Sequence, residues 1–191
     1  MKTLLETVRI PVTEAQQERL QRIDAEDYSG TRMKVREELT KQGIAASENY
    51  LDRGIFALKQ YYAVAMLDPK NMHAISDVID PFWHMHILHT KQYMKFCDDV
   101  IGAYMHHDPL DHANTHKVDA VKRLYDYTVD VFGRMFSHVD PEFYPTNQPK
   151  NRMICLHCNT TSLDLLNQSC FPIVSEFSEF YREYGAPTIA A

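Results

Sequence analysis

The segment from His73 to Gly102 places the strongest constraint on how this chain can fold. At about 100° per residue, its apolar side chains fall on every face of a helix instead of forming one stripe. A helix of this kind is central and buried. Pro81 lies inside the pattern and suits the first turn of a helix better than its middle, so we expect the helix to begin between Asp77 and Asp80.

Further helical patterns lie on both sides of this segment. Thr13 is followed three residues later by Gln16, which is the spacing of a capping box and predicts a helix to about residue 26. Strand signals are nearly absent, whereas apolar residues recur at helical spacing elsewhere in the chain. The other stretches for which we predict helices are residues 31–42, 47–68, 115–136, 162–166 and 174–184.

These patterns predict an all-α fold, a compact bundle of five to six helices with an irregular C-terminal segment. We expect a single helical domain over residues 1–191, because this length fits one domain of ordinary size. Its metal-binding helical core is predicted to span about residues 47–136. Three prolines between residues 138 and 150, without periodicity, mark residues 137–191 as the irregular part.

Composition and charge exclude several classes of protein. A net charge of -6 and a pI near 5.9 argue against a nucleic-acid partner, and no block of Lys and Arg indicates a membrane-surface partner. No apolar run approaches the ~20 residues of a membrane span, and Glu6 and Arg9 interrupt any signal-peptide core. Four cysteines do not suggest a disulfide framework in a chain of this size. We therefore expect a cytoplasmic protein.

Histidine is the most unusual component of the chain, since seven of the ten histidines fall between His84 and His116. Polar groups on a buried helix must be paired or bound to something, and neutral imidazole is the commonest metal ligand. Asp80 precedes His84 by four residues, so it can orient this imidazole or bind metal itself. The predicted metal ligands are His84, His86, His107, Asp80, Cys97, His106 and His89.

Helix geometry divides these candidates between two faces. Asp80 and His84 share one face, because they lie one turn apart. His86 is separated from His84 by about 200° around the axis, so one unbroken helix does not easily offer both to one ion. A shared site requires a helix break near residues 83–86, or two metal ions. The second face aligns His86 with Tyr93 and Cys97.

The donor types indicate the metal and the chemistry. Two histidines and one carboxylate are the ligands of non-haem iron oxygenases, whereas His and Cys with nearby Met favour copper or zinc. We expect iron or copper, with zinc ranking below them, and His106 or His107 could complete either site. The predicted function is an oxidoreductase or oxygenase acting on a small molecule or peptide, with Asp80 and Tyr93 as catalytic residues. The alternative is a non-catalytic metal-binding or protein-interaction module with a structural His/Asp cluster; a homodimer is left open in both cases.

The same segment resembles a known family. The residues that carry the resemblance are Asp80-x-x-Trp83-His84-x-His86-x-Leu88, then Tyr93, Cys97, Gly102 and His106-His107-x-Pro109. Over residues 50–110 this pattern resembles the signature of the glycine-rich-domain-containing-protein-like family. The resemblance implies a helical fold in this region, and His89 is not among the shared positions. With only six glycines and no glycine-rich tail, the chain resembles the short bacterial single-domain form.

A second group of candidate ligands lies near the C-terminus. Cys155-Leu-His157-Cys158 is a C-x-x-C with a histidine inside, and Cys170 follows. A structural zinc site needs four ligands, and the second pair is missing. A redox C-x-x-C normally opens a helix after a strand, which is not the pattern here. Two further interpretations stay open: this segment folds over the histidine site and donates a thiol, or the cysteines are small apolar fillers.

Overall fold

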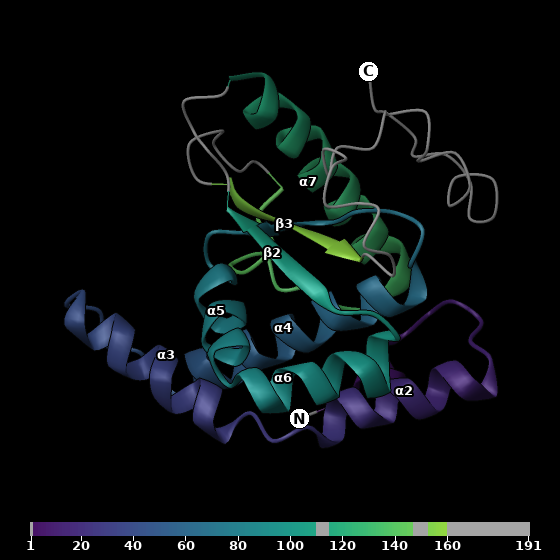
Figure 1. Ribbon diagram of the computed structural model, residues 1–191, viewed down its shortest axis with the longest axis horizontal. Helices are drawn as coiled ribbons and strands as arrows, with labels where there is room; N and C mark the ends of the chain where they lie inside the picture. Colours follow the sequence, from purple (N-terminus) through teal and green to yellow (C-terminus); the bar gives the residue numbers. More distant parts are fainter. Residues whose placement is uncertain (1, 110–114, 147–152, 160–191) are drawn as a thin grey trace.

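The computed structural model describes residues 2–109, 115–146 and 153–159, and helices dominate this part of the chain, as Figure 1 shows. This confirms the predicted helical fold class. The α-helices are α1 (Leu4–Thr7), α2 (Glu14–Ala25), α3 (Ser29–Lys41), α4 (Glu48–Leu67), α5 (Asp80–Leu88), α6 (Thr90–Phe96) and α7 (Thr115–Met135), with a π-helix, η1, at Cys97–Ile101. The helices predicted at 162–166 and 174–184, and Cys170, lie outside the described residues.

Local sequence explains where the main helices begin. At the start of α2, the Thr13 hydroxyl accepts a hydrogen bond from the Gln16 backbone N–H at 3.3 Å, and the Gln16 side chain accepts one from the Thr13 N–H at 2.8 Å. This is the predicted capping box. Ser47 caps α4 in a similar way, since its hydroxyl accepts from the Tyr50 N–H at 3.1 Å. Each cap stabilises its helix by about 1 kcal/mol.

The long helix predicted between residues 73 and 102 is divided in the structure. Strand β1 (Ala74–Ser76) comes first, and α5 then begins at Asp80 with Pro81 in its first turn, as expected. His89 has φ -81° and ψ 56°, which is not helical, and it separates α5 from α6. The break therefore lies beyond both His84 and His86, so these two residues stay on one continuous helix.

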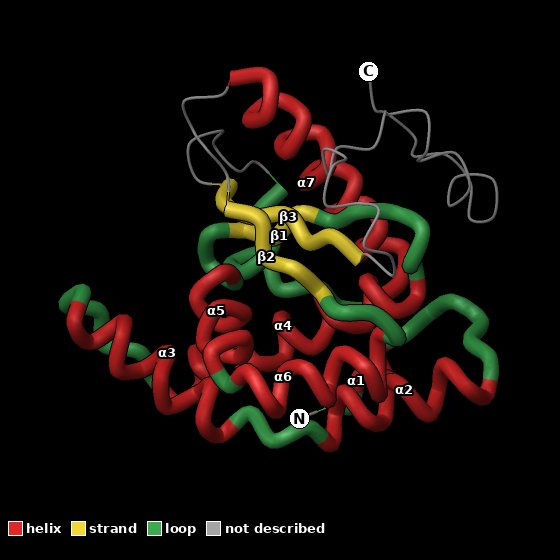
Figure 2. Tube along the Cα trace, viewed as in Figure 1, coloured by secondary structure: helices red, strands yellow, loops and turns green. Residues whose placement is uncertain are grey.

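A small antiparallel sheet, which the sequence did not predict, completes the fold. Its strand order is β1-β3-β2, with β2 at Met105–Pro109 and β3 at Met153–Asn159. Figure 2 shows the strands between α7 and the layer formed by α4, α5 and α6. The strands are short, so the alternation of apolar and polar residues that would reveal them in the sequence is too brief to detect. They also lie far apart in the chain, so no hairpin pattern indicates their pairing.

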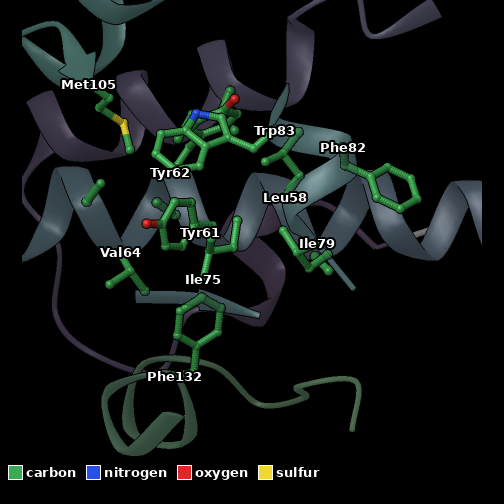
Figure 3. Packing of buried hydrophobic residues seen from close by; sticks show 14 of the residues in the cluster. Leu58, Tyr61, Tyr62, Val64, Ile75, Ile79, Phe82, Trp83, Met105 and Phe132 are labelled. Atoms are coloured by element: carbon green, nitrogen blue, oxygen red, sulfur yellow. The ribbon is translucent and has the colours of Figure 1, made fainter. Parts of the chain in front are cut away.

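Aromatic side chains fill the core where the helices meet the sheet, as Figure 3 shows. Trp83 of α5 lies edge-to-face against Tyr61 of α4, with ring centroids 5.5 Å apart. Burying a large apolar side chain contributes roughly 1.5–3 kcal/mol, so this core accounts for much of the drive to fold. Among the described residues, no helix combines the length and the apolar character that crossing a membrane requires.

Gly54 in α4 allows a close approach between α4 and α5. A Cβ atom at this position would lie 2.1 Å from the buried Phe82 ring, whereas a Cβ atom on Gly133 of α7 would meet nothing within 4 Å. We expect Gly54→Ala to lower the free energy of unfolding by about 1–3 kcal/mol, because the ring must move. Gly133→Ala, the matched control, should raise it by up to about 1 kcal/mol through helix propensity. Urea unfolding followed by circular dichroism measures both, and a Gly54→Ala variant as stable as the wild type would contradict this packing.

Candidate metal centre

Asp80, His84 and His107 converge where the start of α5 meets β2. Asp80 is the first residue of α5, where the helix dipole favours a carboxylate. His84 follows one turn later on the same face of the helix. Gly102 ends η1 with φ 85°, a left-handed conformation that glycine adopts at little cost. This turn reverses the chain and lets β2 return His107 to the start of α5.

The spacing of the three side chains fits a single ion. Asp80 Oδ2 lies 3.2 Å from His84 Nδ1, and Asp80 Oδ1 lies 3.0 Å from His107 Nε2. One ligand atom from each residue can be chosen so that all lie within 4.8 Å of one another. Two ligands at right angles on an ion with bonds of ~2.1 Å are about 3.0 Å apart. The two contacts of Asp80, one through each carboxylate oxygen, are close to this separation.

The group is buried on one side and open on the other. The side chains of Asp80 and His107 are 7% and 11% exposed, whereas that of His84 is 45% exposed. Trp83 covers the buried side, with its ring centroid 4.9 Å from that of His107. Burial lowers the pKa of His84 and outweighs the opposing attraction of the Asp80 carboxylate. The lowered pKa favours the neutral imidazole, which is the form that binds metal.

Tyr93 supports the group indirectly, through hydrogen bonds to Trp83 and to the backbone of β2. Trp83 Nε1 donates to the Tyr93 hydroxyl at 3.0 Å, and this hydroxyl donates to the Met105 carbonyl at 2.8 Å. Burial raises the pKa of Tyr93, so the phenol stays protonated. Tyr93 thereby orients Trp83 and the first residue of β2. These contacts give it a positioning role, and the catalytic role expected from the sequence stays a prediction.

His86 is fully buried and belongs to a separate cluster. Its Nδ1 lies 2.7 Å from the Tyr62 hydroxyl, and its Nε2 faces Glu26 Oε1 at 3.8 Å, which is too far for a hydrogen bond. Burial raises the pKa of Glu26, but the facing His86 and a hydrogen bond from Gln92 bring it below its usual range. The separation of His84 from His86 follows from the 200° step between them. Rings pack around His86 at centroid distances of 5.2–5.6 Å, from Tyr28, Tyr62, Tyr93 and Phe96.

The remaining predicted ligands also lie apart from Asp80. Cys97 is buried, and burial raises the pKa of its thiol, which disfavours the thiolate that a metal needs. His89 packs over Gly30 of α3, where a Cβ atom would come within 2.8 Å of its ring. His106 is exposed, and alternation along β2 puts it on the opposite face from His107. The structure thus separates His86, His89, Cys97 and His106 from the group formed by Asp80, His84 and His107.

A buried polar network that the sequence analysis missed joins α4 to α7. His73 Nε2 lies 3.1 Å from Asp68 Oδ2, and the Tyr127 hydroxyl donates to the same oxygen at 2.7 Å. Asn71 Nδ2 donates to the other oxygen at 2.7 Å. Burial alone would raise the pKa of Asp68, but these contacts, led by His73, bring it below its usual range. In the sequence, Asp68 marked only the end of the helix predicted over residues 47–68, so its carboxylate was given no function.

The fold and the group together define a mainly helical protein with two histidines and one carboxylate at a helix–strand junction. The family model described as UCP032817-like matches residues 18–130, more than half of the 191 residues, and the chain belongs to this family. The expected assignment to the glycine-rich-domain-containing-protein-like family is therefore wrong. The motif around Trp83 serves local packing and the Asp80 group, which does not by itself distinguish families. No curated protein and no solved structure matched the chain.

The hydroxyl of Tyr93 is expected to matter for stability. Tyr93→Phe leaves the Trp83 N–H and the Met105 carbonyl without this partner in the core, so it should cost about 1–3 kcal/mol of unfolding free energy. Tyr104, whose ring lies 5.5 Å from that of Tyr93 and is partly exposed, offers the matched control. Tyr104→Phe should change stability by less than about 0.5 kcal/mol. Equal losses for the two variants in urea unfolding would refute the role of the Tyr93 hydroxyl.

In metal-free protein, His84 should titrate below the ordinary histidine pKa of 6.5, because its burial outweighs the attraction of Asp80. As pH falls from that value toward the lowered pKa, the unfolded chain binds more protons at this residue than the folded chain does. The contribution of His84 to the free energy of unfolding therefore decreases as the pH falls through this window. A proton NMR titration, with the His84 signal assigned by a His84→Gln variant, measures the pKa, and a value above 6.5 would contradict the geometry.

Proposed function

We propose that this protein is a non-haem metal-dependent oxidoreductase that holds iron through Asp80, His84 and His107. The observation that carries the proposal is one buried carboxylate within 3.2 Å of two imidazoles from separate elements. Two nitrogen donors and one oxygen donor are the ligand composition of non-haem iron(II) oxygenases. The side chain of His84 is 45% exposed, so dioxygen or a substrate could reach a bound ion from that side.

The donor set favours iron over copper. Sulfur ligands select copper(I), but Cys97 and Met105 are buried and stand outside the group around Asp80. Zinc accepts two histidines and a carboxylate in hydrolytic enzymes, so the same donors leave it as the alternative metal. Elemental analysis of purified protein separates iron, copper and zinc.

The residues around the group have distinct roles in this proposal. Bound iron would supply redox chemistry toward dioxygen, and three protein ligands leave other positions of an octahedral ion open. Trp83 excludes water from the side of His107, because its ring is fully buried there. We assign the substrate to small molecules or peptides, since the net charge of -6 argues against a nucleic-acid partner, and we keep the cytoplasm as the expected location.

A structural role is the second candidate, and the contacts of Asp80 favour it. The two carboxylate oxygens already bridge His84 and His107, which fixes α5 to β2. A buried bridge of this kind can specify a fold without any metal. The protein would then be an interaction module in which the histidines are structural.

Titration with Fe²⁺ under anaerobic conditions distinguishes the two candidates. We expect calorimetry to show one equivalent bound, and His84→Ala and His107→Ala to weaken binding by at least about tenfold to a hundredfold. His106→Ala is the matched control, because it removes the neighbouring histidine from the other face of β2. Nitric oxide, used as a probe for open positions, should give the EPR signal of a high-spin iron–nitrosyl centre.

Two results would count against the proposed enzyme. Protein that binds no Fe²⁺, with a melting temperature that neither iron nor a chelator changes, would favour the structural bridge. Bound iron that gives no nitrosyl signal would indicate a site with no open position, and hence a non-catalytic metal site.

A further inference from the structure

A cleft of about 350 Å³ lies where α2 and α3 pack on α4, and it shares no residue with the candidate metal centre. Ile55 and Phe56 of α4 line it with apolar surface. Tyr28, the N-cap residue of α3, and Arg32, one turn later, line it from the other helix. This volume is at the lower end of the range for small-molecule sites, so the cleft fits a ligand of the size of one metabolite.

Two buried donor atoms of cleft residues have no hydrogen-bond partner in the described part of the chain. They are the Tyr28 hydroxyl and Arg32 Nε. Tyr28 is 6% exposed, and its ring packs between His86, at a centroid distance of 5.2 Å, and Lys59 Nζ, which lies 5.5 Å from the ring centroid. Buried donors without a partner are rare, because each keeps its full desolvation cost. An acceptor oxygen on a ligand would satisfy both.

The charges that line the cleft are balanced. Arg32 and Lys59 are cationic, whereas Glu26 and Asp52 are anionic. Arg32 Nη2 lies 2.8 Å from Asp52 Oδ1, and Lys59 Nζ lies 3.2 Å from the carboxylate of Asp24. A ligand with a net charge of either sign would therefore meet a like charge close to its partner. A zwitterion carries both signs without a net charge, and it matches this lining.

Glu26 can receive the positive group of such a ligand. Its side chain is 19% exposed, and its Oε1 accepts from Gln92 Nε2 at 2.5 Å, which leaves Oε2 for a second donor. Burial raises the pKa of Glu26, but His86 and Gln92 bring it below its usual range, so the carboxylate is charged at neutral pH. An ammonium group is the complementary donor, because it offers three N–H bonds and a positive charge.

We propose that this cleft binds a free α-amino acid with an apolar side chain. The carboxylate of the amino acid accepts from the Tyr28 hydroxyl and from Arg32 Nε, and its ammonium group pairs with Glu26. The apolar side chain packs on Ile55 and Phe56. A free amino acid carries both charged groups on one carbon atom, whereas an internal residue of a peptide carries neither, so the proposed ligand is the free amino acid.

Calorimetric titration of metal-free protein with L-leucine tests the proposal. We expect a Kd of about 1 mM or lower. 4-Methylpentanoate lacks the ammonium group and 3-methylbutylamine lacks the carboxylate. Each should bind at least about tenfold more weakly, because it leaves polar groups of the cleft without a partner. Glycine should also bind more weakly than leucine, because it has no apolar side chain to bury.

Tyr28→Phe separates a ligand contact from a structural role. The hydroxyl has no partner in the described part of the protein, so its removal should leave the free energy of unfolding unchanged or higher. The affinity for leucine should still fall by at least about fivefold. Arg32→Gln should weaken binding to a similar extent. Arg36→Gln is the matched control and should keep the wild-type affinity, because Arg36 also pairs with Glu48 but does not line the cleft.

Several results would overturn the amino-acid site. They are no binding of leucine, equal affinities for leucine and the two analogues, or a Tyr28→Phe variant that loses stability but keeps its affinity. Amide chemical shifts recorded during the titration should change mainly at residues 26–32 and 52–59, and changes confined to other residues would also refute the assignment. Because metal-free protein is used, none of these results bears on the proposed iron site.

Discussion

The junction between α5 and β2 depends on the carboxylate of Asp80. This residue is 5% exposed, and a buried carboxylate is costly unless it is hydrogen-bonded or paired. One partner, His84, comes from the same helix, while the other, His107, lies 27 residues later in the chain. The turn at Gly102 and the start of β2 must both be in place before the second partner arrives. Satisfying Asp80 therefore also assembles the candidate site.

The residues behind this junction orient the imidazole of His107. His107 packs against Trp83, and the indole N–H of Trp83 is held by the Tyr93 hydroxyl, which in turn donates to the Met105 carbonyl in β2. The chain of contacts thus returns to the strand that carries His107. Ligand groups whose orientation is fixed in this way lose little further entropy on binding an ion. Only the half-exposed His84 retains an open side, and this is the side from which an ion or a small molecule can reach the group.

The sequence predicted those parts of the fold that depend on neighbours in the chain. The capping box of Thr13 and the one-turn spacing of Asp80 and His84 are local relations, and both are present in the structure. That His107 and not His86 joins Asp80 and His84 depends instead on the chain reversal at Gly102 and on strand pairing. Neither of these is visible in the spacing of residues along the sequence. His89, where the helix breaks, packs over Gly30 of α3, and Tyr127 of α7 completes the network around Asp68, so both features involve distant elements.

A site built from two elements has a consequence for the order of folding and metal binding. The ligand atoms of Asp80, His84 and His107 come together only after β2 has docked on α5, so the unfolded chain offers no preformed site. Any ion bound there stabilises the folded state by mass action. The residues matched by the family model include all three group members but end before β3. The region matched by the family model therefore contains all three members of the group, whereas β3, the strand that pairs with β2, lies outside that region.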